Sequence, residues 1–102
     1  MSVVKINQGN FESVKNSERP VLLDFYADWC GPCRMLSPVV DEIAMEREDI
    51  LVGKINVDEE EDLAREFGIF SIPTLVVMKG GRVVSQSAGV RPKAQILAML
   101  EG

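Results

Sequence analysis

Histidine is absent from this chain of 102 residues, and cysteine occurs only twice. A structural zinc site takes four Cys or His ligands, so one chain cannot supply it, and nothing in the sequence supports a site shared by two chains. Without histidine, no Ser/His or Cys/His pair is possible for nucleophilic catalysis. We therefore predict that the protein holds no metal and uses no histidine-based chemistry.

Positive charge and long apolar runs are also scarce. The 11 Lys and Arg residues face 16 Asp and Glu residues, which gives a net charge of −5. An acidic protein without a basic run is a poor binder of nucleic acids and anionic membranes. No apolar stretch approaches the length of a membrane span, and residues 1–7 lack the features of a signal peptide. We expect a cytoplasmic protein that binds neither nucleic acid nor membranes.

The remaining composition is that of a folded protein. Apolar residues make up 46% of the chain, which argues against disorder, and the length suits one domain with one core. The sequence has no internal repeat, low-complexity stretch or long linker. We expect residues 1–102 to form a single domain that works as a monomer.

The two cysteines lie three positions apart in the run Trp29-Cys30-Gly31-Pro32-Cys33. A strand-like apolar run, Val21–Tyr26, precedes them, and a helix-like run, Arg34–Glu48, follows. At a helix start, residues i and i+3 are neighbours at a separation that suits a disulfide. In a reducing compartment such a pair is more often redox-active or metal-binding than structural. The spacing predicts a reversible two-electron switch; the alternative is two buried thiols that only fill the core.

Hydrophobic periodicity predicts an alternation of strands and helices. The expected strands are Val3–Ile6, Val21–Tyr26, Ile50–Val57, Thr74–Met78 and Arg82–Ser87. The alternation favours parallel strands joined by crossover helices, and the glycines after Lys79 predict a late hairpin. These elements predict an α/β fold, a three-layer α/β/α sandwich around a mixed sheet of about five strands.

Helix boundaries follow from capping residues. Asn10 is expected to cap a short first helix, and Asp58 is expected to cap a later helix that ends at Gly68. Pro38 interrupts the helix after the cysteines, so a kink is expected there. Pro92 suits the first turn of the last helix.

Several motifs together resemble the thioredoxin family. The run Trp29 to Cys33 follows a strand that contains Asp24, Ile72-Pro73-Thr74 opens a later strand, and Gly81 and Gly89 follow. The resemblance covers Val3 to Leu100. It implies the thioredoxin fold, with sheet order 1-3-2-4-5 and the last two strands antiparallel to the rest. It also implies a protein-disulfide reductase that needs no cofactor and is recharged by a thioredoxin reductase, through NADPH and a flavin or through ferredoxin.

The chain departs from the family pattern at three places. Tyr26 stands where many members have Trp, and Phe70 stands where a polar or small residue is common. The run from Asp58 to Asp62 is unusually acidic. None of these places touches the reaction centre, but Phe70 and the acidic run are expected to affect the choice of partner.

The two cysteines are expected to have different roles. A helix N-terminus stabilises a thiolate, so Cys30 is expected to attack the disulfide of a client protein. Cys33 lies one turn into the helix and is expected to be more buried and less acidic. It would resolve the mixed disulfide, so that the client leaves reduced and Cys30 and Cys33 are bridged.

Asp24 is the candidate proton acceptor, because it interrupts an apolar strand where burial would raise its pKa. Lys54, in another strand, could face Asp24 and lower that pKa again. The alternatives are a solvated Asp24 at a strand end and an exposed surface Lys54. Gly31 and Pro32 are expected to set the redox potential, since neither stabilises the thiolate by donating a hydrogen bond and neither is the His of oxidising relatives.

A flat apolar rim around Cys30 is expected to bind clients. Its candidates are Trp29, Ile72, Gly89 and Val90, with loose specificity. By resemblance Pro73 is cis and brings its loop beside the cysteines, with the Ile72 backbone free to pair with an extended client. The alternatives are an ordinary trans Pro73 and core or structural roles for Trp29, Ile72 and Val90.

Two other function classes remain open. A disulfide oxidase or isomerase would need an oxidising compartment and a destabilised disulfide. A non-catalytic assembly module would use the same apolar rim as a reductase. The favoured interpretation is a reductase that maintains cellular redox balance.

Overall fold

The computed structural model describes residues 3–102, which form five strands and four helices in the predicted order. The strands are β1 (Val3–Lys5), β2 (Val21–Tyr26), β3 (Leu51–Asn56), β4 (Thr74–Lys79) and β5 (Arg82–Ala88). The helices are α1 (Gln8–Lys15), α2 (Gly31–Glu46), α3 (Glu61–Glu66) and α4 (Lys93–Glu101). Within the described residues, no helix has the length and apolar character needed to cross a bilayer.

All five strands belong to one mixed sheet with the order β1-β3-β2-β4-β5, which confirms the expected order. β1 and β2 both pair with β3 in parallel, β4 pairs antiparallel with β2, and β5 pairs antiparallel with β4. β5 therefore runs in the same direction as β1 to β3. The expectation that both last strands oppose the rest is wrong for β5, because the hairpin after β4 reverses the chain a second time.

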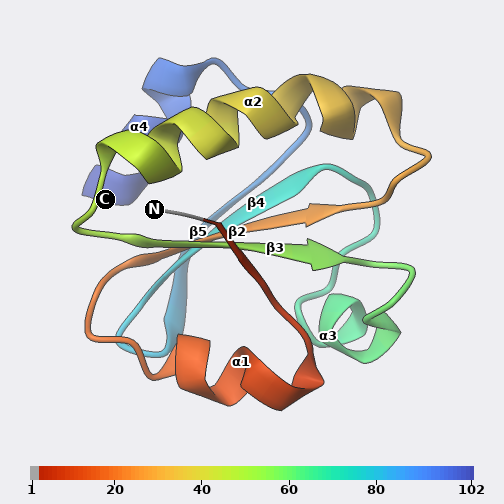
Figure 1. Ribbon diagram of the computed structural model, residues 1–102, viewed down its shortest axis with the longest axis horizontal. Helices are drawn as coiled ribbons and strands as arrows, with labels where there is room; N and C mark the ends of the chain where they lie inside the picture. Colours follow the sequence, from red (N-terminus) through yellow and green to blue (C-terminus); the bar gives the residue numbers. More distant parts are fainter. Residues whose placement is uncertain (1–2) are drawn as a thin grey trace.

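Helices cover both faces of the sheet, which confirms the three-layer sandwich. Figure 1 shows α2 and α4 on one face and α1 and α3 on the other. β2 lies between β3 and β4, and its side chains alternate between the two faces. Leu22 belongs to the cluster under α2 and α4, whereas Leu23 and Phe25 belong to the cluster on the α1 and α3 side. Since Asp24 is two residues after Leu22, it lies on the α2 face.

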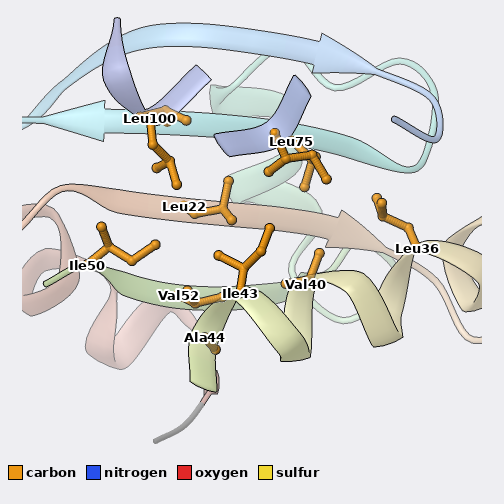
Figure 2. Packing of buried hydrophobic residues seen from close by; sticks show 11 residues of the cluster. Leu22, Leu36, Val40, Ile43, Ala44, Ile50, Val52, Leu75 and Leu100 are labelled. Carbon is orange, nitrogen blue, oxygen red and sulfur yellow. The ribbon is translucent and has the colours of Figure 1, made fainter. Parts of the chain in front are cut away.

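The core beneath α2 fixes the position of that helix. Leu36, Val40 and Ile43 follow helical spacing and are fully buried. They pack with Leu22 of β2 and Leu75 of β4, as Figure 2 shows. Burial of each such side chain stabilises the fold by about 1.5–3 kcal/mol. This packing anchors α2, so its first turn, with the cysteines, is held against the end of β2.

Several boundaries differ from the sequence expectations. α2 begins at Gly31 and ends at Glu46, and it runs as one helix through Pro38. Asn7, not Asn10, is the N-cap of α1; Asn10 instead completes a reciprocal capping box with it. Asp58 does not cap α3, whose N-cap is Glu60 without a side-chain cap. Pro92 is the residue before α4, not part of its first turn.

The predicted hairpin is confirmed. Gly80 and Gly81 join β4 to β5, with φ angles of 61° and 80°. A two-residue hairpin turn with both φ angles positive suits the twist of the strands, and glycine adopts it without strain.

Candidate redox-active site

Strand register brings distant parts of the chain together at one end of the sheet. Because β4 is antiparallel to β2, its first residue, Thr74, pairs with Phe25 near the end of β2. The same Thr74 pairs with Ala88 at the end of β5. The segment before β4 and the segment after β5 therefore meet beside the start of α2.

The loop before β4 has the predicted conformation. The peptide bond between Ile72 and Pro73 is cis. Gly89, with a φ of 91°, donates its N–H to the carbonyl oxygen of Pro73 at 2.8 Å. The carbonyl oxygen of Ile72 lies 3.9 Å from the sulfur of Cys30. This loop therefore forms one wall around the cysteines.

The two cysteines form a disulfide with a Cα–Cα distance of 5.2 Å, as their spacing predicts. Cys30 is the N-cap of α2, and its Sγ accepts the N–H of Cys33 at 3.1 Å. Cys30 and Cys33 are 4% and 3% exposed. Burial therefore does not distinguish the two sulfurs; what distinguishes them is that only Cys30 holds the capping position, where the helix dipole stabilises negative charge.

Asp24 lies in β2, on the face covered by α2, and is only 1% exposed. Its Oδ1 has no hydrogen-bond partner within the described part of the chain. Burial raises the pKa of Asp24 from 3.8 to about 6; the positive charge of Lys54 opposes this rise, and the negative charge of Asp41 adds to it. A cavity of about 230 Å³ is lined by both Asp24 and Cys33. This space connects the carboxyl group with the second cysteine and is large enough for water.

Lys54 is the register partner of Asp24 in the neighbouring strand and lines the same cavity. Its ammonium group pairs with Asp41 at 3.0 Å and hydrogen-bonds to the hydroxyl of Ser37. Lys54 is partly buried, so it is not an ordinary surface lysine. It acts on Asp24 through space, while its direct partners are both on α2.

Ser37 and Asp41 were missed by the sequence analysis. They follow Cys33 at intervals of four residues, which puts all three on one side of α2. That spacing was a usable signal. The packing of this side of α2 over β3, which brings Lys54 within reach, has no counterpart in the local sequence pattern.

The residues of the expected client rim differ in exposure. Trp29 is 69% exposed, and its indole N–H donates to Asp58 at 2.8 Å. Val90 is exposed, Ile72 and Gly89 are half-buried, and Pro73 is buried. Among the residues the structure describes, the backbone N–H of Ile72 makes no hydrogen bond. Gly31 does not have a positive φ, and a Cβ there would meet nothing, so its backbone geometry does not require glycine.

Between residues 3 and 102 there is no group of three or more His, Cys, Asp or Glu side chains placed to hold a metal ion. The chemistry that the site does offer belongs to sulfur. Two cysteines within bonding distance at a helix N-terminus can exchange between a disulfide and a dithiol. The fold and the site therefore define a thiol–disulfide oxidoreductase.

Comparisons with known proteins agree with this class. The thioredoxin family model matches residues 2–102. A thioredoxin from Alicyclobacillus acidocaldarius is 46% identical over 100 residues, covering 97% of this chain and 95% of that protein. A bifunctional thioredoxin reductase/thioredoxin from Mycobacterium leprae is 47% identical over 88 residues, covering 85% of this chain and 19% of that protein. The solved structure of a mutant thioredoxin from Halobacterium salinarum superposes with a TM-score of 0.91 at 39% identity, covering 98% of this chain and 88% of that one.

The chain belongs to the thioredoxin family. It is a thiol–disulfide oxidoreductase that reduces protein disulfides by dithiol–disulfide exchange, with Cys30 and Cys33 as its redox pair.

Proposed function

We propose that Cys30 attacks and Cys33 resolves. The observation that supports these roles is that Cys30 is the N-cap of α2, where its sulfur accepts the backbone N–H of Cys33. In the reduced protein, the Cys30 thiolate attacks one sulfur of a client disulfide. A Cys30–client disulfide forms, and the other client sulfur leaves and takes up a proton. Cys33 then attacks the Cys30 sulfur, which closes the Cys30–Cys33 disulfide and releases the second client thiol. Two electrons pass from the protein to the client.

Asp24 serves as the base for the second step. Its raised pKa of about 6 still leaves it mostly ionised at pH 7. A water in the cavity shared by Asp24 and Cys33 carries the thiol proton to the carboxylate. Lys54 acts as a positioning residue that limits the rise of this pKa. Gly31 and Pro32 tune the redox potential, because neither offers the cationic side chain that would over-stabilise a thiolate.

Clients bind along the rim beside Cys30. Trp29 and Val90 provide exposed apolar surface, and the Ile72 backbone offers a strand-like pairing edge. Pro73 and Gly89 shape this edge through the hydrogen bond that the Gly89 N–H donates to the Pro73 carbonyl oxygen. Because apolar burial is not directional, this part of the surface accepts many sequences.

The protein works with a thioredoxin reductase, which returns two electrons to the Cys30–Cys33 disulfide after each cycle. The bifunctional relative from Mycobacterium leprae, which carries both names, supports this pairing. We further propose that the chain is a single-domain monomer of the cytoplasm, that it needs no cofactor beyond its own disulfide, and that it maintains the redox balance of the cell.

The test separates the cysteine roles. The Cys33→Ser variant should accumulate a covalent adduct between Cys30 and a client such as insulin, because nothing resolves it. The Cys30→Ser variant should trap little. Adducts are counted by mass spectrometry after acid quenching. Equal trapping by the two variants would contradict the assignment.

An insulin precipitation assay with dithiothreitol distinguishes the reductase from a non-catalytic module. Precipitation that is fast with the native protein and lost in Cys30→Ser supports the reductase, whereas equal rates favour a module. Equilibration with glutathione separates a reductase from an oxidase, since a reductase should remain oxidised at high ratios of reduced to oxidised glutathione.

A further inference from the structure

Phe70 is 98% exposed, the most exposed of the large apolar side chains in the described part of the protein. It lies in the loop between α3 and the cis Ile72–Pro73 bond. A single exposed apolar residue is ordinary and needs no explanation. Phe70 is different because of what lies on each side of it.

Two hollows meet at Phe70. One, of about 180 Å³, is lined by Trp29, Val57, Ile69, Phe70, Ser71 and Ile72. The other, of about 340 Å³, shares Val57, Ile69 and Phe70 and continues along α3. Its remaining lining residues are Gly68, Arg65, Ala64 and Glu61. The two hollows adjoin at these shared residues, and together they extend from Trp29 and Ile72 past Phe70. We call them together the Phe70 groove.

The far end of the Phe70 groove is acidic. Glu61 lines this groove and also a neighbouring hollow formed by the acidic run from Asp58 to Asp62 with Gln8. Lys5 pairs with Glu59, and Arg65 pairs with Asp62. Glu61 has no salt bridge among residues 3–102, so two cations face five carboxylates. Negative charge therefore exceeds positive charge at this end of the groove, although Arg65 lines it as well.

We propose that the Phe70 groove selects clients whose disulfide-bearing segment is extended and carries an apolar side chain followed, further from the cysteine, by Lys or Arg. In an extended segment, every second side chain points to the same side. With the client cysteine at Cys30, the next side chain on that side reaches Phe70, and the one after it reaches Glu61. Charge complementarity raises the encounter rate, and apolar burial at Phe70 slows release.

This proposal rests on the exchange reaction described above and adds specificity to it. The probe is a palindromic peptide whose alternate positions read Lys, Leu, Cys, Leu, Lys, oxidised to a symmetric disulfide dimer. The palindrome makes the result independent of the chain direction of binding. In two matched peptides, Glu replaces Lys or Ser replaces Leu. Reduction by the pre-reduced protein is followed by chromatography of the freed peptide thiols, with hydroxyethyl disulfide as a small reference substrate.

The native protein should reduce the Lys peptide about tenfold faster than the Glu peptide at low salt, and the ratio should shrink as salt increases. Phe70→Ser should lower the preference for Leu over Ser about fivefold. Glu61→Gln should lower the preference for Lys over Glu about threefold. The control Glu66→Gln changes an exposed acid of α3 outside the groove and should leave both preferences unchanged. Each rate is divided by that for the small disulfide, which removes effects on exchange itself.

Preferences that remain in both Phe70→Ser and Glu61→Gln, with normal reduction of the small disulfide, would overturn the Phe70 groove proposal alone. Failure of the native protein to reduce the small disulfide would overturn the exchange proposal instead. Sedimentation of the native protein and Phe70→Ser tests another occupant: a dimer that Phe70→Ser dissolves would mean that a second copy fills the groove, which also overturns the proposal.

Discussion

At the scale of single residues, Asp24 is the clearest case in which a group that suits the proposed chemistry also destabilises the fold. Among residues 3–102 it is the only buried carboxylate, and one of its oxygens has no partner. Ionising a group in such a place costs free energy that the fold must supply. The same cost makes the group a base near neutral pH, because its pKa is raised from 3.8 to about 6.

This conflict predicts a pH-dependent effect of Asp24→Asn on stability. Below pH 3.8 the carboxyl group is neutral in both the folded and the unfolded states. Between pH 3.8 and about 6, only the unfolded chain loses this proton, so Asp24 lowers the free energy of unfolding as pH rises. Since one pKa unit corresponds to about 1.36 kcal/mol, the loss reaches about 3 kcal/mol by pH 7. The stability of Asp24→Asn relative to the native protein should therefore rise by about that amount from pH 3.5 to pH 7.5.

Urea unfolding of the oxidised forms at several pH values measures the difference. Comparing the two proteins at each pH removes the contribution of all other titrating groups. A difference that stays constant across this range would show that the pKa of Asp24 is not raised by burial.

At the scale of elements, β3 is held close to the segment after β1. Gly53 lies in β3, and a Cβ on this residue would come within 2.9 Å of Ile6 Cγ1 and closer still to Ile6 Cδ1. Ile6 is itself fully buried, so it has little room to move. The residue is glycine because of this close contact, since its φ is not in the left-handed range.

Gly53→Ala should destabilise the protein by about 1–3 kcal/mol through overpacking. Ile6→Val removes Cδ1, the closest atom, and alone should cost about 1 kcal/mol. The double variant should be clearly more stable than the sum of the two single effects allows, because the smaller side chain makes room for the new methyl group. Urea midpoints with unchanged m values test this. Strict additivity would mean that the two side chains do not meet.

Elements were predicted well where the signal is local, and poorly where tertiary contacts compete. The hairpin followed from Gly80 and Gly81, whose positive φ values depend on the turn alone. The helix cap expected at Asp58 failed because a turn, in which the carbonyl oxygen of Asn56 accepts the N–H groups of Glu59 and Glu60, precedes α3 and delays its start to Glu61. The separation of the cysteine pair followed from spacing. The ion pair between Asp41 and Lys54 could not be predicted in this way, because it depends on how α2 packs on β3.

At the scale of the whole molecule, the redox state and the stability of the fold are linked. The disulfide closes a loop between residues only three positions apart. In the chain-entropy description, so short a loop stabilises the folded state by about 2 kcal/mol relative to the reduced chain. By the same cycle, folding favours the disulfide over the dithiol by that amount.

The oxidised protein should therefore resist urea better than the reduced protein, by about 2 kcal/mol. Unfolding is followed at pH 7 with and without excess dithiothreitol. The Cys30→Ser/Cys33→Ser variant is the control, and dithiothreitol should not change its stability. A reduced form as stable as the oxidised form would show that thiol interactions in the fold offset the cross-link completely.

The antiparallel pairing of β4 with β2 also places the disulfide and the β4–β5 turn at opposite ends of the sheet. β4 starts beside the disulfide, and its last residues pair near the start of β2, so the Gly80–Gly81 turn lies at the opposite end of the sheet. A tether, dye or electrode linker attached at this turn would orient the sulfur pair outward, toward whatever the immobilised protein is meant to meet.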